Sequence, residues 1–305
     1  MFDLLQSWIL IELRQLICVD AVAAHRHFTR AAAAVGIAQP ALSHQIKRLE
    51  QELGVALFHR SRAGVSLTEA GEILLPRIRR AMSELAAGRE ELAAITGLET
   101  GRVRLGAMQA LGRLDLPGAI ARFHREHPAI EITLSEDSTA HMQQLVLDGR
   151  LDLAIAALDV AVSDDLSARV LVTEAVLVAL PRLHPLASRS AIELGLLRDD
   201  RFVLFRPGTG LRTITERAAH EAGFSPRVAL ETGNLDRLIA LVNEGLGVSL
   251  VPESTVRHAP PGVRAVPLSR PLIRTVGLLS RPDRWLSPSA RALRDLLVDT
   301  ARPAT

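Results

Sequence analysis

The sequence predicts two unlike domains, a small N-terminal domain built mostly of helices and a larger C-terminal α/β domain, joined by a long helix. Apolar residues recur at helical spacing up to Leu53 and again from Thr68 to Thr96. From Gly101 onward, short apolar strands alternate with amphipathic helices, which is typical of an α/β domain. A length of 305 residues also suits about two domains.

Basic side chains are concentrated near the N-terminus. Residues 11–68 contain seven Lys or Arg against four Asp or Glu, whereas the whole chain has a formal net charge of only +2. A small basic module on a nearly neutral body is the charge distribution expected of a protein that binds nucleic acid. The alternative is an ordinary surface that happens to carry arginines.

Residues 28–53 have the pattern of a helix-turn-helix. We expect Thr29 to cap the first helix, Gly36 to allow a tight turn, and Pro40 to lie in the first turn of the second helix. The apolar stripe of the second helix should be buried, and it consists of Leu42, Ile46, Leu49 and Leu53. The opposite face would then be polar and exposed, as in a helix that reads DNA.

A short hairpin is expected over residues 55–67, with Gly64 in its turn, so the module is predicted to be a winged helix-turn-helix. Gln39 can read adenine through two hydrogen bonds, whereas Lys47 and the arginines are expected to hold phosphates. The residues expected to contact DNA are Thr29, Arg30, Gln39, Pro40, Ser43, His44, Lys47, Arg60 and Arg62. The alternative is a plain two-helix hairpin with a solvated polar face.

The stretch from Phe28-Thr29-Arg30-Ala31-Ala32 through Ala38-Gln39-Pro40-Ala41-Leu42-Ser43-His44-Gln45-Ile46-Lys47-Arg48-Leu49-Glu50 to Leu67-Thr68-Glu69-Ala70-Gly71 resembles the N-terminal signature of LysR-type transcriptional regulators. The resemblance covers about residues 11–300. Ala38 replaces the Ser or Thr that is frequent there, and His44 stands where Arg is common. Residues 1–10 precede the usual start. The resemblance implies a promoter-binding regulator that answers to a small molecule.

A linker helix is predicted over residues 68–98, with Thr68 as its N-cap and Pro76 as a site of kinking. Its heptad-like seam comprises Gly71, Leu75, Ile78, Met82, Leu85, Arg89, Leu92 and Thr96. Packing of this helix on its own domain is one interpretation, and pairing with a second copy is the other. The resemblance implies pairing, as a homodimer or homotetramer on a roughly palindromic site. It adds double-stranded promoter DNA as a partner and RNA polymerase as a further candidate.

Residues 101–305 resemble the effector-binding domain of the same family, which is similar to periplasmic solute-binding proteins. The resemblance implies two Rossmann-like lobes, one from residues 101–171 with 275–301 and one from residues 172–274. The predicted strands are Val103–Ala107, Ile130–Leu134, Leu153–Ala157, Ala175–Leu180, Phe202–Phe205, Val228–Glu231, Val248–Val251 and Thr275–Leu279.

The cleft between the lobes is the expected effector pocket, because ligands of open α/β sheets bind at strand ends and helix N-termini. The candidate effector-binding residues are Met108, Gln109, Ser138, Thr139, Arg206, Gly208, Thr209 and Asn234. Ser138 and Asn234 can equally be helix caps, and Gly208 merely part of a turn. Because these candidates include Arg206 and no acidic side chain, an organic anion is the expected effector.

The sequence lacks the signatures of the other classes of protein. His124 and His127 stand three apart without the motif of a zinc hydrolase, and Gly245 and Gly247 lack the third glycine of a dinucleotide site. No cofactor, metal site or catalysis is therefore expected. Cys18 is the only cysteine, which excludes a two-cysteine redox switch. The chain has no signal peptide or run of 18 apolar residues, so we expect it in the cytoplasm.

Two alternatives remain. The first is a solute-binding or enzymatic α/β domain with an incidental helical N-terminus, and the second is a constitutive regulator whose pocket binds nothing.

Overall fold

The computed structural model describes residues 11–61, 64–95, 100–282 and 286–301, and the chain divides into two compact units, Met1–Ala86 and Ala87–Thr305. Residues 1–10, Arg62 and Thr96 lie outside the described residues. Helix α5, Glu69–Ile95, contributes to both units.

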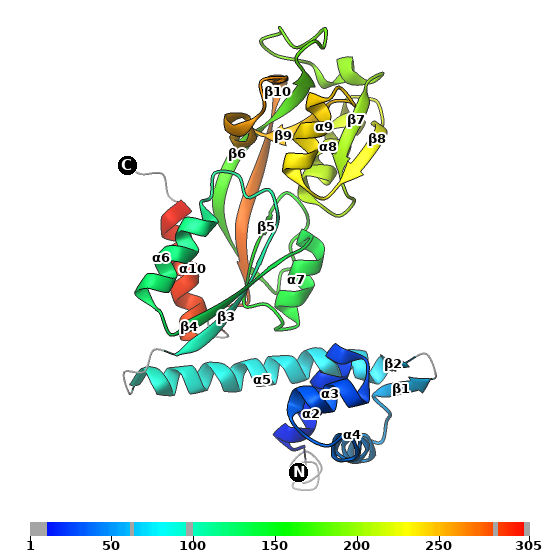
Figure 1. Ribbon diagram of the computed structural model, residues 1–305, viewed down its shortest axis with the longest axis vertical. Coiled ribbons are helices and arrows are strands. Elements are labelled where there is room, and N and C mark those ends of the chain that lie inside the picture. Colours follow the sequence, from blue (N-terminus) through cyan, green and yellow to red (C-terminus); the bar gives the residue numbers. More distant parts are fainter. Residues whose placement is uncertain (1–10, 62–63, 96–99, 283–285, 302–305) are drawn as a thin grey trace. The chain divides into compact units, whose positions relative to one another are not determined.

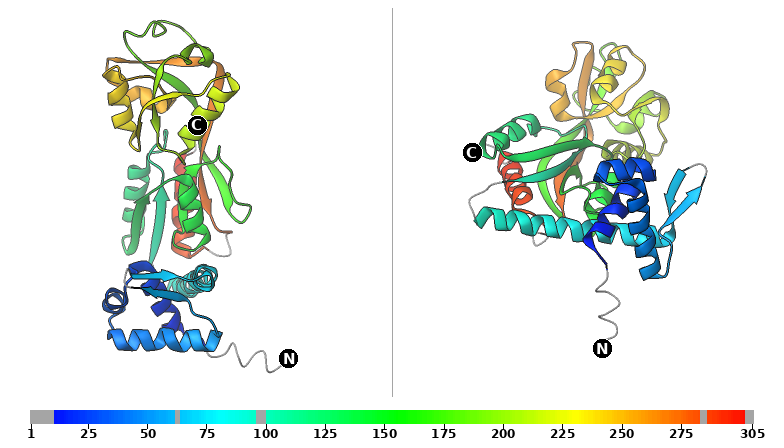
Figure 2. Two further views of the ribbon diagram at one scale, coloured as in Figure 1. Left: turned by 90° about the vertical axis from the view of Figure 1, so that its right-hand side faces the viewer. Right: turned by 60° about the horizontal axis from the view of Figure 1, so that its bottom comes forward.

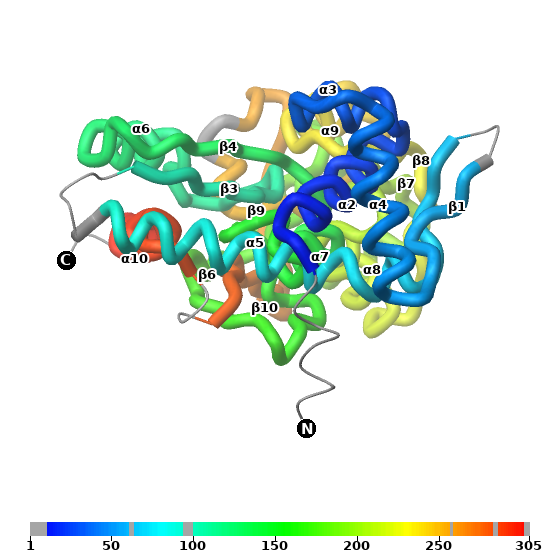
Figure 3. The backbone as a smooth tube through the Cα atoms, turned by 90° about the horizontal axis from the view of Figure 1, so that it is seen from below, coloured from blue at the N-terminus to red at the C-terminus, as the bar shows by residue number. Residues whose placement is uncertain are grey.

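The first unit contains α2 (Leu13–His25), α3 (Phe28–Val35), α4 (Gln39–Leu53) and a hairpin of β1 (Phe58–Ser61) and β2 (Gly64–Leu67), followed by the first part of α5. Figure 3 shows the three short helices gathered together, with the hairpin beside α4. Their shared core includes Leu42, Ile46 and Leu49, so three of the four residues of the predicted stripe of α4 are buried, and Leu53 packs against the same core while partly exposed. Cys18 lies in the same core, where burial raises the pKa of its thiol.

The ends of α3 and α4 follow from local backbone chemistry. Gly36 and Gly54 end the two helices with positive φ angles of 74° and 71°, a conformation that glycine adopts without steric cost. The predicted cap of α3 was wrong: the N-cap is His27, whose Nδ1 accepts a hydrogen bond from the Thr29 backbone N–H at 3.2 Å. Thr29 therefore lies inside the first turn. Ala38 begins α4 without a side-chain cap, as its methyl group requires.

The linker helix α5 starts after Thr68, as the sequence predicts. The Thr68 hydroxyl caps the helix by accepting a hydrogen bond from the Gly71 N–H at 3.1 Å. The helix continues through Pro76. In the first half of the predicted seam, Leu75, Ile78 and Met82 pack on the core of the first unit. In the second half, Leu85 and Leu92 are 55% and 66% exposed. The first half of the seam thus packs against its own domain, whereas the second half exposes two leucines to solvent.

The second unit contains a six-stranded mixed sheet with the order β4-β3-β5-β10-β6-β9 and a two-stranded sheet of β7 and β8 (Figure 1). Its strands are β3 (Gly101–Ala107), β4 (Ile130–Glu136), β5 (Leu153–Ala157), β6 (Ser167–Pro181), β7 (Arg201–Phe205), β8 (Arg227–Thr232), β9 (Ser249–Pro252) and β10 (Val263–Ser280). Its helices are α6 (Leu116–Glu126), α7 (Thr139–Leu147), α8 (Gly210–Glu221), α9 (Leu235–Asn243) and α10 (Pro288–Ala301), with short 3-10 turns η1 (Leu194–Leu197) and η2 (Glu253–His258). Each predicted strand overlaps one of these, so the existence of all eight strands is confirmed, but β6 and β10 are much longer than the predicted Ala175–Leu180 and Thr275–Leu279.

Two long antiparallel strands, β6 and β10, connect the two halves of this unit. One core lies between the sheet and α6 and α10, and a separate core surrounds β7, β9 and α9. Figures 1 and 2 show α7 on the opposite face of the first half from α6 and α10. The predicted lobe boundaries fall within the paired strands, where Thr275 lies opposite Thr173 and Arg274 opposite Glu174. The chain therefore passes twice between the lobes at one place in the sheet.

Candidate DNA-reading surface and effector cleft

The exposed face of α4 carries the polar residues that the sequence assigns to DNA. Gln39, Pro40, His44 and Lys47 are exposed and Ser43 is partly buried. The Gln39 amide donates a hydrogen bond to the Ser43 hydroxyl at 2.9 Å, so these two polar groups form a pair in the first turn. The buried leucine and isoleucine side chains hold α4 on the domain. The polar side chains of the opposite face are therefore not needed for its packing.

Exposed cations also lie on α3 and the hairpin. The Arg60 guanidinium lies 4.4 Å from the centroid of the Phe28 ring, and Phe28 in turn meets Phe58 edge to face. This stacking gives Arg60 a preferred direction although its side chain is exposed. Arg30 is anchored by a hydrogen bond from its Nη2 to the His25 carbonyl at 3.2 Å.

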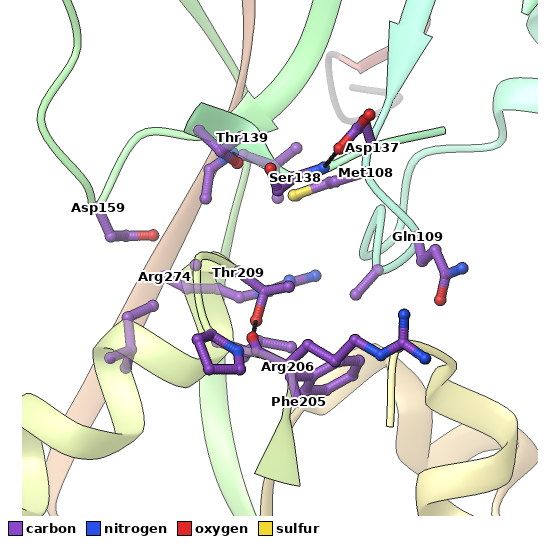
Figure 4. Close-up of a pocket in the computed structure, with 18 of the residues that line it drawn as sticks. Met108, Gln109, Asp137, Ser138, Thr139, Asp159, Phe205, Arg206, Thr209 and Arg274 are labelled. Atoms are coloured by element: carbon purple, nitrogen blue, oxygen red, sulfur yellow. Dashed lines mark hydrogen bonds between the residues drawn. The ribbon is translucent and has the colours of Figure 1, made fainter. Parts of the chain in front are cut away.

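The second unit holds a cavity of about 340 Å³ between its two lobes (Figure 4). The strand ends of β3 and β5 and the N-terminus of α7 supply one wall, and the end of β7 with the N-terminus of α8 supplies the other. Its lining residues are Met108, Gln109, Ala110, Glu136, Asp137, Ser138, Thr139, Ala157, Asp159, Phe205, Arg206, Pro207, Thr209, Gly210, Leu211, Ile214, Gly233, Arg274, Thr275 and Val276.

Six of the eight candidate effector-binding residues lie in this lining, namely Met108, Gln109, Ser138, Thr139, Arg206 and Thr209. Gly208 and Asn234 do not. Gly208 has a φ of 84° in the turn before α8, and the Asn234 side chain caps α9 by accepting from the Arg237 N–H at 2.8 Å. Both positions thus take the structural role that the sequence left open for them.

Two of the lining hydroxyls already accept hydrogen bonds within the protein. The Thr139 hydroxyl, which is buried, accepts a hydrogen bond from the Ala157 N–H at 3.1 Å and joins α7 to the end of β5. The Ser138 hydroxyl caps α7 through the His141 N–H at 3.4 Å. A hydroxyl used as an acceptor can still donate, so neither group is lost to a ligand.

The cleft also contains charged residues that sequence reasoning missed. Arg274 of β10 is almost fully buried, and its Nε and Nη2 donate to Glu174 Oε1 at 2.9 and 2.6 Å. Burial lowers the pKa of Arg274, and the neighbouring Glu174 opposes that shift. Asp159 accepts a hydrogen bond from the Thr275 N–H at 2.8 Å, and Glu136 and Asp137 lie on the same lobe.

The candidate effector-binding residues therefore left out the acidic side chains that line the cleft. Asp159 follows strand β5 by two residues, so the rule that strand ends face the cleft would have found it. Arg274 lies in the middle of a strand, and no local signal indicates it.

Comparison with known proteins identifies both units. Residues 13–72 match the model of the bacterial regulatory helix-turn-helix protein, lysR family, and residues 96–302 match the LysR substrate binding domain. The transcriptional dual regulator GltC of Bacillus subtilis is 34% identical over 94% of this chain and 97% of its own. The regulator ShiR of Corynebacterium glutamicum is 32% identical over 95% of this chain and 98% of its own.

A solved structure gives the same result. Full-length OxyR C199D from Pseudomonas aeruginosa is 29% identical and covers 97% of this chain and 96% of its own with a TM-score of 0.77. In the part of the chain that the structure describes, no helix is both long enough and apolar enough to span a membrane. The matched relatives are named as regulators, so this chain is a transcriptional regulator and not an enzyme. It belongs to the LysR family of bacterial helix-turn-helix regulators.

Proposed function

We propose that this regulator reads a roughly palindromic promoter site through α4 as a homodimer or homotetramer, and that a small carboxylate in the interlobe cleft alters its hold on that site. The observation that carries the proposal is that one chain has both an exposed polar face on α4 and an interlobe cavity lined by charged, hydroxyl and apolar side chains. A protein that binds promoter DNA in a bacterium works in the cytoplasm, and RNA polymerase is its further partner.

The chemistry of α4 supports direct reading of bases. Gln39 presents an amide, the group that pairs bidentately with adenine, and Ser43 positions it through their hydrogen bond. His44 is exposed one residue further along the helix, where it can meet a base edge or a phosphate. Lys47, Arg30 and Arg60 supply the phosphate contacts, which fix the position of the helix without specifying sequence.

The exposed half of the α5 seam supports pairing of two copies. Leu85 and Leu92 are seven residues apart, so they lie on one face of the helix. In a monomer this face leaves both leucines in water. Burying them against the same face of a second copy would place two recognition helices on one DNA duplex, as a palindromic site requires.

The start of α8 supports a carboxylate effector. Thr209 precedes the helix but does not cap it, because its hydroxyl donates instead to the Arg206 carbonyl at 3.0 Å. Gly210 and Leu211 line the cavity, and their N–H groups have no acceptor among the described residues. Unpaired N–H groups at a helix N-terminus attract an anion, and Arg206 adds a full positive charge nearby.

The last turns of α5 contact the effector-binding domain and can couple a change in that domain to the linker helix. The Glu90 carboxylate accepts a hydrogen bond from the Ser289 N–H at 3.4 Å, and Glu91 pairs with Arg291 at 3.1 Å. These contacts fix the end of the linker helix to α10 of the first lobe. An effector that favours one arrangement of the lobes would shift the population of oligomer geometries and so the spacing and bend at the promoter.

The test is selection of binding sites from random duplex DNA by the full chain, followed by gel-shift titration at several salt concentrations with and without a panel of carboxylates. We expect a palindromic consensus, an affinity that falls with salt, and one carboxylate that changes the affinity or the bend. Absence of sequence preference would overturn the DNA-reading proposal. Sequence-specific binding that no carboxylate alters would instead indicate a constitutive regulator.

A further inference from the structure

The two lobes present opposite charges to the cavity. Asp159, Glu136 and Asp137 line it from the first lobe, whereas Arg206 and the N-terminus of α8 line it from the second. In Figure 4 the Asp159 carboxylate is directed into the space between the two walls, and Arg206 and Thr209 lie on the opposite wall. The cleft therefore has a negative pole and a positive pole rather than a uniformly positive surface.

Asp159 is the centre of the negative pole. Its Oδ2 accepts from the Thr275 N–H at 2.8 Å, and its Oδ1 has no hydrogen-bond partner in the described parts of the chain. Asp137 is more fully engaged, because its Oδ1 accepts from the Ser138 N–H and its Oδ2 lies 3.6 Å from His141 Nε2. The nearby Arg274 gives its Nε and Nη2 to Glu174 and forms no ion pair with Asp159. Asp159 therefore interacts electrostatically with the buried Arg274 without pairing with it. A partly buried carboxylate without a directly paired cation favours a ligand that supplies one.

The positive pole lies across the cavity. The backbone amides of Gly210 and Leu211 are buried and lack an acceptor within the described structure, and a buried N–H without an acceptor is costly. Arg206 is exposed, lines the same cavity and takes part in no ion pair among the described residues. Two backbone donors and a guanidinium suit the two oxygens of one carboxylate.

We propose that the effector is an amino acid or another small aminocarboxylate, with its carboxylate at the N-terminus of α8 and its ammonium group at Asp159. This proposal rests on the proposed function and names the effector class of the same cleft. Such a ligand satisfies both poles at once and bridges the two lobes. A plain carboxylic acid satisfies one pole only and removes water from Asp159 without replacing it. The apolar part of the lining, which includes Met108, Phe205 and Ile214, surrounds the rest of the ligand.

The experiment measures the thermal stability of the full-length protein against matched probes. The panel contains the twenty standard amino acids, β-alanine and 4-aminobutyrate, each with its 2-hydroxy or deaminated acid and, where available, its decarboxylated amine. We expect at least one amino acid to raise Tm, because a ligand of the native state stabilises it by mass action. We expect its matched acids and its amine to bind at least tenfold more weakly in isothermal titration.

Asp159→Asn tests the assigned pole, because asparagine keeps an oxygen that can accept from Thr275 and loses only the charge. We expect at least a tenfold loss of affinity for the amino acid and an unchanged or improved affinity for its deaminated acid. Asp165→Asn, an exposed acid of the same lobe outside the cavity lining, is the matched control and should change neither affinity. Equal losses for both ligands in Asp159→Asn would overturn the assignment of Asp159 to the ammonium group.

The outcomes separate this proposal from the proposed function. If deaminated or hydroxy acids bind as tightly as the amino acids and alter promoter affinity, the aminocarboxylate proposal fails and the carboxylate-responsive regulator stands. If an amine binds without a carboxylate, the pole at α8 is wrong. If no probe shifts Tm or promoter affinity while sequence-specific DNA binding is intact, both the aminocarboxylate proposal and the effector role of the cleft are overturned.

Discussion

Glu174 and Arg274, 100 residues apart in the sequence, form a buried ion pair where β6 and β10 pass between the lobes. The Arg274 Nη2 lies 2.6 Å from Glu174 Oε1, and the two side chains are 3% and 1% exposed. The other Glu174 oxygen accepts from the Ser254 N–H at 3.1 Å, which ties η2 to the same point. Arg274 also lines the cavity, so the pair joins the effector cleft to the strands that connect the lobes.

Replacing one member of this pair should lower the free energy of unfolding much more than replacing both members should. Glu174→Met leaves a buried guanidinium without its counter-ion, and Arg274→Met leaves a buried carboxylate, each at a cost of about 3–5 kcal/mol. The double variant should cost clearly less than the sum, because no charge remains unpaired. Urea unfolding of the full chain measures all three.

The exposed pair of Arg122 and Glu126 on α6 provides the control, since its replacement by methionine should leave the urea midpoint unchanged. Strictly additive losses at Glu174 and Arg274 would show that the two charges are not coupled.

Gln39 and Lys47 should differ in what they contribute to DNA binding. Gln39→Ala removes an amide that reads a base edge, so we expect a loss of about 1–3 kcal/mol for the selected site and relaxed preference at one base pair. Lys47→Ala removes a phosphate contact, so affinity should fall on every sequence and the salt slope should decrease by about 1. Gel shifts on the selected site and on single-base variants measure both.

Gln51→Ala is the matched control, because Gln51 is exposed at the far end of α4 and should leave site affinity unchanged. A Gln39→Ala protein that keeps its full base preference would remove Gln39 from the reading surface.

Pairing through α5 should depend on its exposed leucines. In the variant Leu85→Asp/Leu92→Asp, two charges would enter the proposed apolar seam, and burying an unpaired carboxylate is costly. We expect sedimentation velocity to show a shift toward monomer and the palindromic site to be bound at least tenfold more weakly. Ile73→Asp changes an equally exposed apolar residue on another face of the same helix and should leave the oligomer intact. An unchanged oligomer in the double variant would place the interface elsewhere.

The sequence was a good guide where a feature depends on neighbours in the chain. The stripe of α4 and the strands of the second unit follow from apolar spacing, and Thr68 and Asn234 cap helices through groups close in sequence. Even locally, two residues can compete for one role, as His27 and Thr29 do at the start of α3. The first half of the α5 seam shows another limit, because a heptad spacing does not say which surface it packs against.

Contacts between distant segments were beyond the sequence. Nothing near Arg274 indicates that Glu174 faces it, since their pairing depends on the register of two long strands. Asp159 was detectable only as a strand-end residue, and its acceptance of the Thr275 N–H depends on the same strand β10. The acidic side chains of the effector cleft were therefore missed, although six of the eight candidate residues line it.

Gly210 shows how closely the lobes approach one another. A Cβ added at this position would lie 2.4 Å from the Ala157 Cβ, so α8 of the second lobe meets the end of β5 in the first lobe where only glycine fits. In Gly210→Ala the helix start must move away from β5, which disturbs the positive pole of the cleft. We expect a cost of about 1–3 kcal/mol from overpacking and a lower Tm. We also expect weaker binding of any effector found by thermal shift.

Gly195→Ala is the matched control because the nearest atoms would lie 3.6 and 3.7 Å from its Cβ, at ordinary contact distance. Its Tm should stay equal or rise slightly, since alanine restricts the unfolded chain. The decisive comparison is between the two variants in effector titrations that use the promoter gel shift as readout. If Gly210→Ala responds to the effector as the unmodified protein does, the contact with Ala157 does not control the cleft. If its response is lost while DNA binding alone is retained, closure of the lobes at this contact is part of the signal.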